Sequence, residues 1–326
     1  MSSYADLELA SWRRLGSAAA QRLADRIADD IGAELVEVRP HQYAGRPGRI
    51  ARYRRDGTLY ALVPGGEAML GYDGAWFTPT PELAADYAAW PDGLPSDIRA
   101  FVDLVTSPPR VRQLPTLLVA VEAVEPGARP ADPDDPHVRV VLAALQRDWE
   151  QLYRPPGRIT HYDWGRVEVT VDERCQPTSA QVVEYVTRDA VVDDLAGRGL
   201  RLLSPDAWEH ACGAGAKTLF RWGDDCPTDC YPTQRRDGPH RLANAVGLVI
   251  GHDPYRPECT ADPAVDCGGD GGRATCGDYG GFVGWVTLAT AYRDRFYDVW
   301  PGSDHEVQHW ADEPSQLFVR PVIELG

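Results

Sequence analysis

Cysteine is the residue type whose spacing first suggests chemistry. Five of the seven cysteines lie between residues 226 and 276, and the first two, Cys226 and Cys230, have three residues between them. Zinc sites use close cysteine pairs of this kind, but the other three cysteines stand eight or nine residues apart, so a second close pair is absent. Two interpretations stay open: thiols packed in the core of a loop-rich region, or a metal site that combines cysteines with His240 or His252.

A second candidate is the sequence HEVQH at 305–309. It matches the HExxH pattern of zinc proteases, in which two histidines one helical turn apart, here His305 and His309, bind zinc and the glutamate acts as base. Pro314 follows closely and no apolar stripe accompanies the pattern, so a helix here would run for only about two turns. The sequence therefore favours a solvated turn capped by Asp304, with a zinc site as the alternative.

The charge balance indicates which partners to expect. The chain carries 49 acidic and 33 basic residues, a formal net charge of -16, and Lys217 is its single lysine. Without a basic cluster to neutralise phosphates, nucleic-acid binding is not expected, whereas the negative field favours a basic protein partner. Because loops carry recognition on rigid scaffolds, the loop-rich segment at 223–284 is the expected contact surface. Its candidate acceptors for partner arginines are Asp224, Asp225, Asp229, Asp253 and Asp270.

The chain shows no sequence sign of export or membrane insertion. No apolar run has the length of a membrane span, and the first residues lack the basic, apolar and small-residue order of a secretory signal. We therefore expect a cytoplasmic protein that does not bind a membrane, in which the odd number of cysteines are thiols. The oligomeric state is left open by the sequence.

The elements that would position these residues follow from periodicity and turn signals. Apolar residues step by three or four from Trp12 to Ile31, which predicts one helix closed by Gly32. The pair Asp56 and Gly57 predicts a hairpin over residues 49–63.

Later in the chain, three more helices are expected. One begins near residue 136 with Leu142 and Leu145 in its apolar stripe, and a second follows a Thr187 cap. A third, over 204–212, should begin at a Ser204 cap and bury Trp208. After residue 212 the periodicity fades, and the 31 glycines and 27 prolines of the chain indicate many loops.

The segment GLRLLSPDAWEHA at 199–211 resembles the GKRLPTEAEWEYA signature of the formylglycine-generating enzyme (sulfatase-modifying factor) family. The resemblance implies an α+β fold: an irregular mixed domain with a C-type-lectin-like core over residues 60–326, preceded by an N-terminal helix and hairpin extension at 1–59. Six other pieces of the chain occur in the order of that family: YALVPGGEAMLGYD (60–73), FRWGDD (220–225), NAVGL (244–248), CGGDGG (267–272), ATAYR (289–293) and FVRPV (318–322).

The activity of that family carries over only where its functional residues match. The enzymes resembled bind copper through a cysteine pair just after the glycine motif and oxidise a substrate cysteine with oxygen. Here Cys267 lies inside the glycine motif and Cys276 nine residues later, with no second cysteine at the expected place. Ile250 also stands where a calcium ligand is expected, and its side chain cannot bind a hard cation.

Two functional hypotheses follow from these differences between the chain and the family that it resembles. The first is a non-catalytic or catalytically diverged protein-binding module of the immunity type, which needs no cofactor and meets a basic protein partner. The second is a metal-dependent oxidase of the same superfamily with a rewired site that holds copper, iron or zinc, so whether the chain is an enzyme stays open. The candidate residues of the second hypothesis are Cys267, Cys276 and Arg293 for catalysis, and Cys226, Cys230, His252, His305 and His309 for metal binding.

Overall fold

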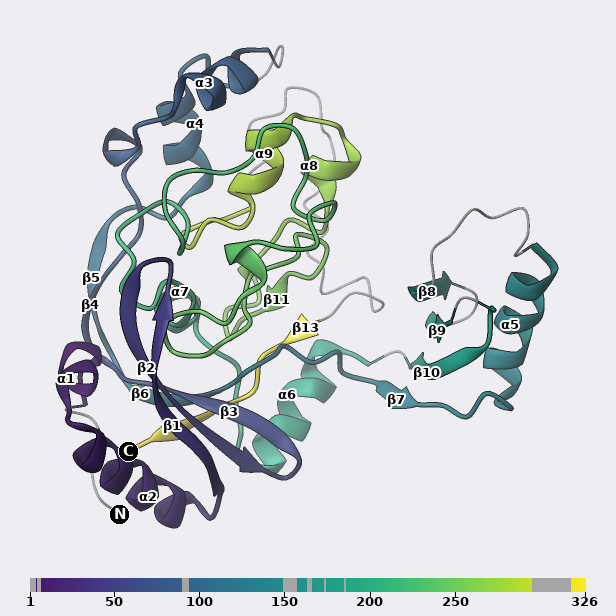
Figure 1. Cartoon of the computed structure of the whole chain (residues 1–326), viewed down its shortest axis with the longest axis horizontal. Coiled ribbons are helices and arrows are strands. Elements are labelled where there is room, and N and C mark those ends of the chain that lie inside the picture. The colour runs from purple at the N-terminus through teal and green to yellow at the C-terminus, as the bar shows by residue number, and fades with distance from the viewer. Residues whose placement is uncertain are drawn as a thin grey trace. The chain divides into compact units, whose positions relative to one another are not determined.

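The computed structural model describes residues 4, 7–89, 94–148, 157–162, 166–172, 174–184, 186–294 and 318–326. The chain divides into two compact units (Figure 1). The first contains the described residues of Met1–Val124, Leu195–Gln308 and Phe318–Gly326, and the second contains those of Glu125–Asp194. The HEVQH sequence, with His305 and His309, lies outside the described residues.

A five-stranded antiparallel sheet forms the frame of the first unit. The turn between β2 and β3 places Asp56 and Gly57 at φ of 50° and 77°. This confirms the predicted hairpin, since the favoured two-residue turn needs two positive φ values. In spatial order the strands are β1 (Glu34–Tyr43), β2 (Arg46–Arg55), β3 (Thr58–Val63), β6 (Thr116–Ala120) and β14 (Val322–Leu325).

The sheet and the second unit correct the predicted domain boundaries. We expected an extension at 1–59 before a single domain over 60–326, but β2 pairs with β3 across that boundary, so both parts share one sheet. Residues 125–194 also form a separate unit. The sequence does not reveal this unit, because its strands and helix show the same apolar patterns as the rest of the chain.

Two helices replace the single N-terminal helix that the periodicity predicted. Helix α1 (Leu9–Arg14) ends before Leu15 and α2 (Ser17–Ile31) begins after Gly16, and both intervening residues are extended. Glycine costs about 1 kcal/mol relative to alanine in a helix interior, which favours the break at this place. Gly32 ends α2 in the left-handed conformation, at φ 64° and ψ 42°, as predicted.

Helices surround an aromatic core in another part of the first unit. Phe77 stacks on Phe282 with ring centroids 5.6 Å apart, and Tyr87 and Phe101 contact the same ring at 6.0 and 6.4 Å. Strands β4 and β5 pair in antiparallel fashion beside these helices. The elements are β4 (Gly66–Leu70), η1 (Gly74–Trp76), α3 (Pro81–Ala88), α4 (Ile98–Val105), β5 (Arg110–Leu114) and α9 (Gly281–Val286).

The helix predicted over 204–212 is α7 (Pro205–Gly213). The Ser204 hydroxyl accepts the N–H of Ala207 as an N-cap, and Trp208 is only 1% exposed. From the end of α7 to residue 294 the described chain has only short elements, which confirms the predicted loss of periodicity. They are η2 (Pro239–Arg241), β11 (Glu258–Cys259), β12 (Asp266–Cys267), α8 (Arg273–Cys276) and α9, with β11 pairing also with β13 (Phe318–Val319).

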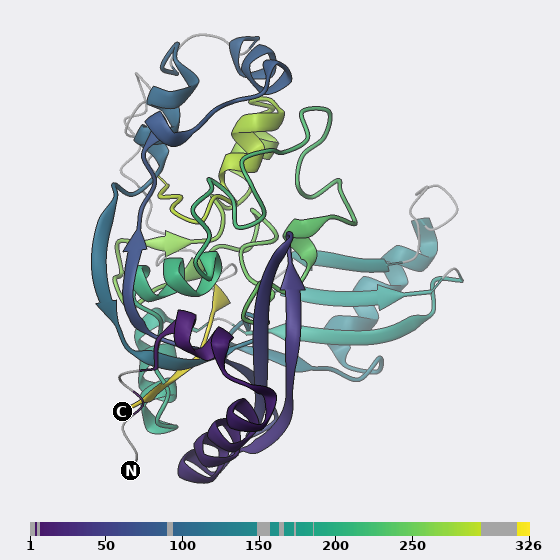
Figure 2. The ribbon, with the colours of Figure 1, turned by 60° about the vertical axis from the view of Figure 1, so that its left-hand side comes forward.

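The second unit is a four-stranded antiparallel sheet with a helix packed on it (Figure 1 and Figure 2). Leu142 and Leu145 of that helix are buried, as the apolar stripe predicted. Thr187 Oγ1 accepts the N–H of Ala190 at 3.2 Å and so caps the next helix, α6 (Arg188–Gly197), also as predicted. In spatial order the strands are β7 (Ala128–Pro130), β10 (Pro177–Val183), β9 (Arg166–Val171) and β8 (Gly157–Tyr162), and the packed helix is α5 (Pro136–Asp148).

These elements define an α+β protein. Its named strands pair in antiparallel fashion, except that β11 and β13 run parallel. None of the helices in the described ranges combines the length and the apolar character that crossing a membrane requires. The first unit contains all the motifs on which the family resemblance depends.

Candidate functional site

The carboxylate of Glu209 joins three of the motifs that resemble the enzyme family. Glu209 is 2% exposed, and one of its oxygens accepts the N–H of Gly71. The other oxygen accepts from Ser107 Oγ at 3.0 Å, Arg110 Nη2 at 2.9 Å and Arg293 Nη2 at 2.8 Å. Arg293, a candidate catalytic residue, therefore forms an ion pair with a buried carboxylate, and the contacts of the same carboxylate with Gly71 and Arg110 join α7 to the end of β4 and to β5.

Trp208 belongs to a second buried network on the same helix. Its Nε1 donates to Glu258 at 2.8 Å, and Arg320 binds the same carboxylate at 2.6 and 2.8 Å. Arg320 also donates to three backbone carbonyls, among them that of Val249 at 2.9 Å. A Cβ on Gly268 would lie 2.8 Å from the Trp208 ring, so the glycine motif permits this close packing.

Asn244 has a comparable structural role. It is completely buried, and its amide nitrogen donates to the carbonyls of Ala211 and Cys212 at 2.7 and 3.0 Å near the end of α7. Its side-chain oxygen accepts the N–H groups of Val246 and Leu248. These motif residues thus satisfy buried backbone groups, which would otherwise cost free energy.

The two cysteines in and after the glycine motif lie in different environments. Cys267 is completely buried, and burial raises the pKa of its thiol to about 12. Cys276 is exposed, and its Sγ lies 3.0 Å from Tyr255 Oη. Ile250, at the position of the expected calcium ligand, is buried in the apolar core.

The other candidate metal ligands that the structure describes do not form a cluster either. Among those residues, no group of three or more histidine, cysteine, aspartate or glutamate side chains could hold a metal ion. Burial, with Arg256 next in effect, lowers the pKa of His252 to about 3. Burial raises the thiol pKa of both Cys226 and Cys230.

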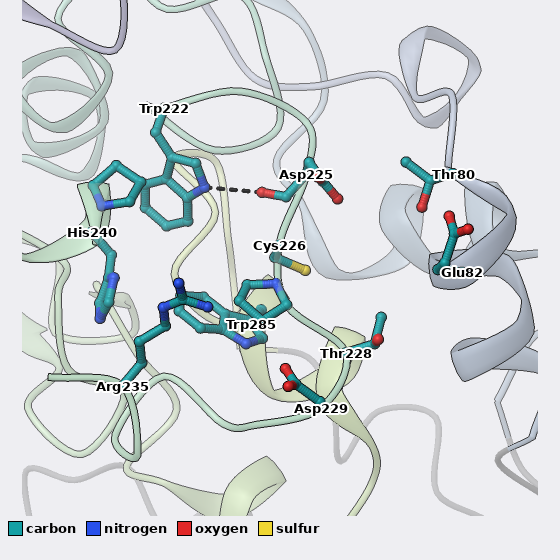
Figure 3. Close-up of a pocket in the computed structure, with 12 residues that line it drawn as sticks. Thr80, Glu82, Trp222, Asp225, Cys226, Thr228, Asp229, Arg235, His240 and Trp285 are labelled. Atoms are coloured by element: carbon teal, nitrogen blue, oxygen red, sulfur yellow. Dashed lines mark hydrogen bonds between the residues drawn. The ribbon is translucent and has the colours of Figure 1, made fainter. Parts of the chain in front are cut away.

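A pocket of about 500 Å³ lies beside these two cysteines (Figure 3). Its aromatic side contains Trp222, Trp285 and His240, with ring centroids 4.9 to 6.2 Å apart and steeply inclined planes. Trp222 Nε1 donates to the Asp225 carbonyl at 3.0 Å, and Trp285 Nε1 donates to the Cys230 carbonyl at 2.8 Å. The two indoles thereby fix the loop 225–230, and the CPTDC sequence forms part of the pocket wall.

Acidic groups dominate the charge of the pocket. Asp225, Asp229 and Glu82 line it and are exposed, with Arg235 as its one lining arginine or lysine. Figure 3 shows Glu82 on the side of the pocket opposite His240. Burial, followed by the nearby charges of Arg241 and Arg221, lowers the pKa of His240 to about 4. The histidine is therefore neutral near pH 7, and the pocket carries a net negative charge.

The five predicted partner-binding aspartates thus differ in their surroundings. Asp225 and Asp229 line the pocket. Asp224 accepts from Leu219 N–H at 2.7 Å, and Asp253 accepts from Tyr255 N–H at 3.0 Å. Asp270 is 3% exposed and accepts the N–H groups of Gly272 and Ala274 at the start of α8. The prediction that Asp270 meets a partner is therefore corrected, because its carboxylate stabilises a turn.

Sequence reasoning missed Glu82, Thr80 and Arg235 as pocket residues. Thr80 and Glu82 begin α3, and only the folded chain brings that helix to the loop at 225–230. No local signal in the sequence could have identified them.

Comparison with known proteins identifies no relative. No family model matches the chain, and neither a curated protein nor a solved structure matches it. The fold and the site together define an α+β protein with an acidic, partly aromatic pocket in a loop-rich region. Its function is therefore argued from the site.

Proposed function

We propose that the chain is a protein-binding module of the immunity type, and that its pocket receives an arginine or lysine side chain from a basic partner. The pocket carries this proposal, because it brings together the carboxylates of Asp225, Asp229 and Glu82. Carboxylates bind guanidinium and ammonium groups through charge-assisted hydrogen bonds.

The charges in and around the pocket favour the binding of a cationic side chain. Asp225, Asp229 and Glu82 form no ion pair with another residue that the structure describes. Arg235 lies 3.6 Å from Asp237, so part of its charge is already compensated outside the pocket. The net charge of -16 would also steer a basic protein toward this surface.

We also propose that the chain is a diverged member of the formylglycine-generating enzyme family that retains the scaffold without the copper chemistry. The buried roles of Glu209, Asn244 and Arg320 support this, because residues that carry the resemblance stabilise the fold. The separate surroundings of Cys267 and Cys276 support the loss of the thiolate pair, since a cuprous site needs both sulfurs close together.

The binding proposal is tested by using the wild-type protein and two matched variants as baits to capture binding partners from a lysate of the native host. One variant carries Asp225→Asn and Asp229→Asn in the pocket. The control carries Asp29→Asn and Asp134→Asn, which remove the same charge from exposed positions elsewhere. Wild type and the control should recover the same basic protein, and the pocket variant should lose it.

The recovered partner is then measured in solution against all three proteins at several salt concentrations. We expect the association rate to fall as salt rises and the pocket variant to dissociate at least about tenfold faster, because charge-assisted hydrogen bonds are lost. Equal binding by pocket variant and control would refute the assignment of the pocket. Recovery of nucleic acid alone, or an association rate indifferent to salt, would refute the module itself.

The copper prediction tests the oxidase alternative. Purified protein should hold less than one equivalent of copper by elemental analysis, and with cuprous ion and a cysteine-containing sulfatase-type peptide it should consume oxygen no faster than the same mixture without protein. The reason is that the two thiols lie in different environments: Cys267 is completely buried, whereas Cys276 is exposed and contacts Tyr255. Oxygen consumption that disappears in a Cys276→Ser variant would establish the oxidase instead.

A further inference from the structure

A second and larger cavity lies in the first unit. Its volume is about 750 Å³, within the range of sites for small molecules. It is bordered by α1, by β4 and by the chain that follows α7, elements that can be located in Figure 1. None of its lining residues belongs to the acidic pocket, so a ligand in this cavity would be independent of the proposed function.

One side of this cavity is apolar and only partly covered. Leu9, Leu70 and Leu219 line it, together with Met69 and Trp76, which are 61% and 50% exposed. Large apolar side chains this accessible cost free energy unless a ligand or partner covers them. The cavity can therefore hold an apolar body of ligand size.

Two cations also line this cavity. Lys217, the single lysine of the chain, is exposed at the lining, and Arg13 lines the cavity from α1. A Cβ on Gly215 would lie 3.5 Å from Arg13 Nη1, so the loop that leads to Lys217 rests on this guanidinium. Arg13 Nη2 donates to the Ala214 carbonyl at 2.7 Å. The guanidinium and the lysine thus belong to one small region.

The charge of Arg13 is not compensated within the described structure. Its Nε is buried without a hydrogen-bond partner, and no described carboxylate forms an ion pair with it. Burial and, after it, the nearby Arg46 lower the pKa of Arg13. Arg13 is half-buried, and its guanidinium makes one backbone hydrogen bond and no ion pair with a described carboxylate, so an anion in the cavity would gain a charge-assisted hydrogen bond from it.

The carboxylates that line the cavity do not fill this role. Glu209 is fully engaged by Gly71, Ser107 and the two arginines of its ion pairs. Glu8 and Glu67 are exposed and therefore solvated. Thr290 also lines the cavity.

We propose that this cavity binds a small amphipathic carboxylate, with its head group on Arg13 and Lys217 and its apolar tail along Met69, Trp76 and Leu219. The proposal rests on the coincidence of exposed apolar side chains with Arg13 and Lys217, which form no ion pair with a described carboxylate, in the lining of one cavity. A neutral or cationic amphiphile of the same length gains only the apolar contacts.

Three probes with a common tail separate the head-group contribution: decanoate, decanol and decyltrimethylammonium. Binding is followed by titration calorimetry and by tryptophan fluorescence, below the concentrations at which the probes form micelles. Decanoate should bind at one molecule per chain and more tightly than the other two. Because Lys217 is the single lysine, decanoate should also slow its acylation by an amine-reactive reagent, as measured on the Lys217 peptide by mass spectrometry.

Single substitutions test which side chains bind the carboxylate head group. Arg13→Gln should weaken decanoate binding about tenfold or more, as loss of a charge-assisted hydrogen bond does, and Lys217→Gln about two- to fivefold, as for an exposed ion pair. Neither should change decanol binding. Arg54→Gln, a control at an exposed position of β2, removes one charge elsewhere and should change nothing.

Lys217→Gln replaces an exposed side chain, so it tests the proposal even if Arg13→Gln fails to fold. Decyltrimethylammonium binding as tightly as decanoate would overturn the proposal, as would Lys217 acylation that decanoate leaves unchanged. Binding of decanoate only at micelle-forming concentration, or equal affinity in the Lys217→Gln and Arg54→Gln proteins, would overturn it as well.

Discussion

Replacing Glu209 with alanine is expected to lower the free energy of unfolding by about 3 kcal/mol or more, because removing one partner of a buried ion pair leaves its other partners uncompensated. Glu209 is 2% exposed, and the Arg110 and Arg293 side chains that bind it are 16% and 11% exposed. The change would also leave the N–H of Gly71 and the hydroxyl of Ser107 without their acceptor.

Asp206→Asn is the matched control for this prediction. Asp206 lies one turn earlier on α7 and also binds Arg110, but its side chain is 29% exposed. Its loss should cost only about 1 kcal/mol or less, as for partly exposed ion pairs. Urea unfolding of both variants measures the difference, and a Glu209→Ala protein no less stable than Asp206→Asn would show that the network does not hold α7 in place.

Short sequence signals correctly predicted helix caps, helix ends and turns, because these features depend only on neighbouring residues. Ser204 caps α7 as expected, and Gly32 ends α2, because each needs only its own conformation or a nearby backbone group. The turn at Asp56 and Gly57 formed for the same reason. The burial of Trp208 also followed from its position on one face of a short helix.

The partners of these residues could not be predicted in the same way. Arg110 reaches Glu209 from a position 99 residues earlier in the chain, and no pattern near either residue indicates the contact. Glu82 joins Asp225 in the pocket for a similar non-local reason. Asp270 resembled the other aspartates in sequence, but only the folded turn of α8 shows that its carboxylate is already used.

The acidic pocket and the cavity beside Arg13 also show how local and global charge differ. The net charge of -16 predicts a basic partner and says nothing about single sites. Arg13 and Arg46 each have a buried nitrogen without a hydrogen-bond partner, so a small positive region persists in an acidic protein. A protein of this kind can attract a cation at one site and an anion at another.

Trp208→Ala is expected to cost about 3 kcal/mol or more in the free energy of unfolding, as truncations of large buried aromatic residues do. The side chain is 1% exposed, and Gly251 and Gly268 approach its ring so closely that a Cβ on either would lie 3.3 or 2.8 Å away. Backbone packed this tightly cannot collapse easily into the space that the indole leaves.

Trp208→Phe separates the two contributions of the indole. Phenylalanine retains much of the ring volume but loses the Nε1 donor to Glu258, whose carboxylate keeps both bonds from Arg320. We expect this variant to lose about 1.5–3 kcal/mol, as for a hydrogen bond to a charged group. Denaturant unfolding followed by near-ultraviolet circular dichroism gives both values. If Trp208→Ala were no more destabilising than Trp208→Phe, the tight packing of the glycine motif against the ring would contribute nothing measurable to stability.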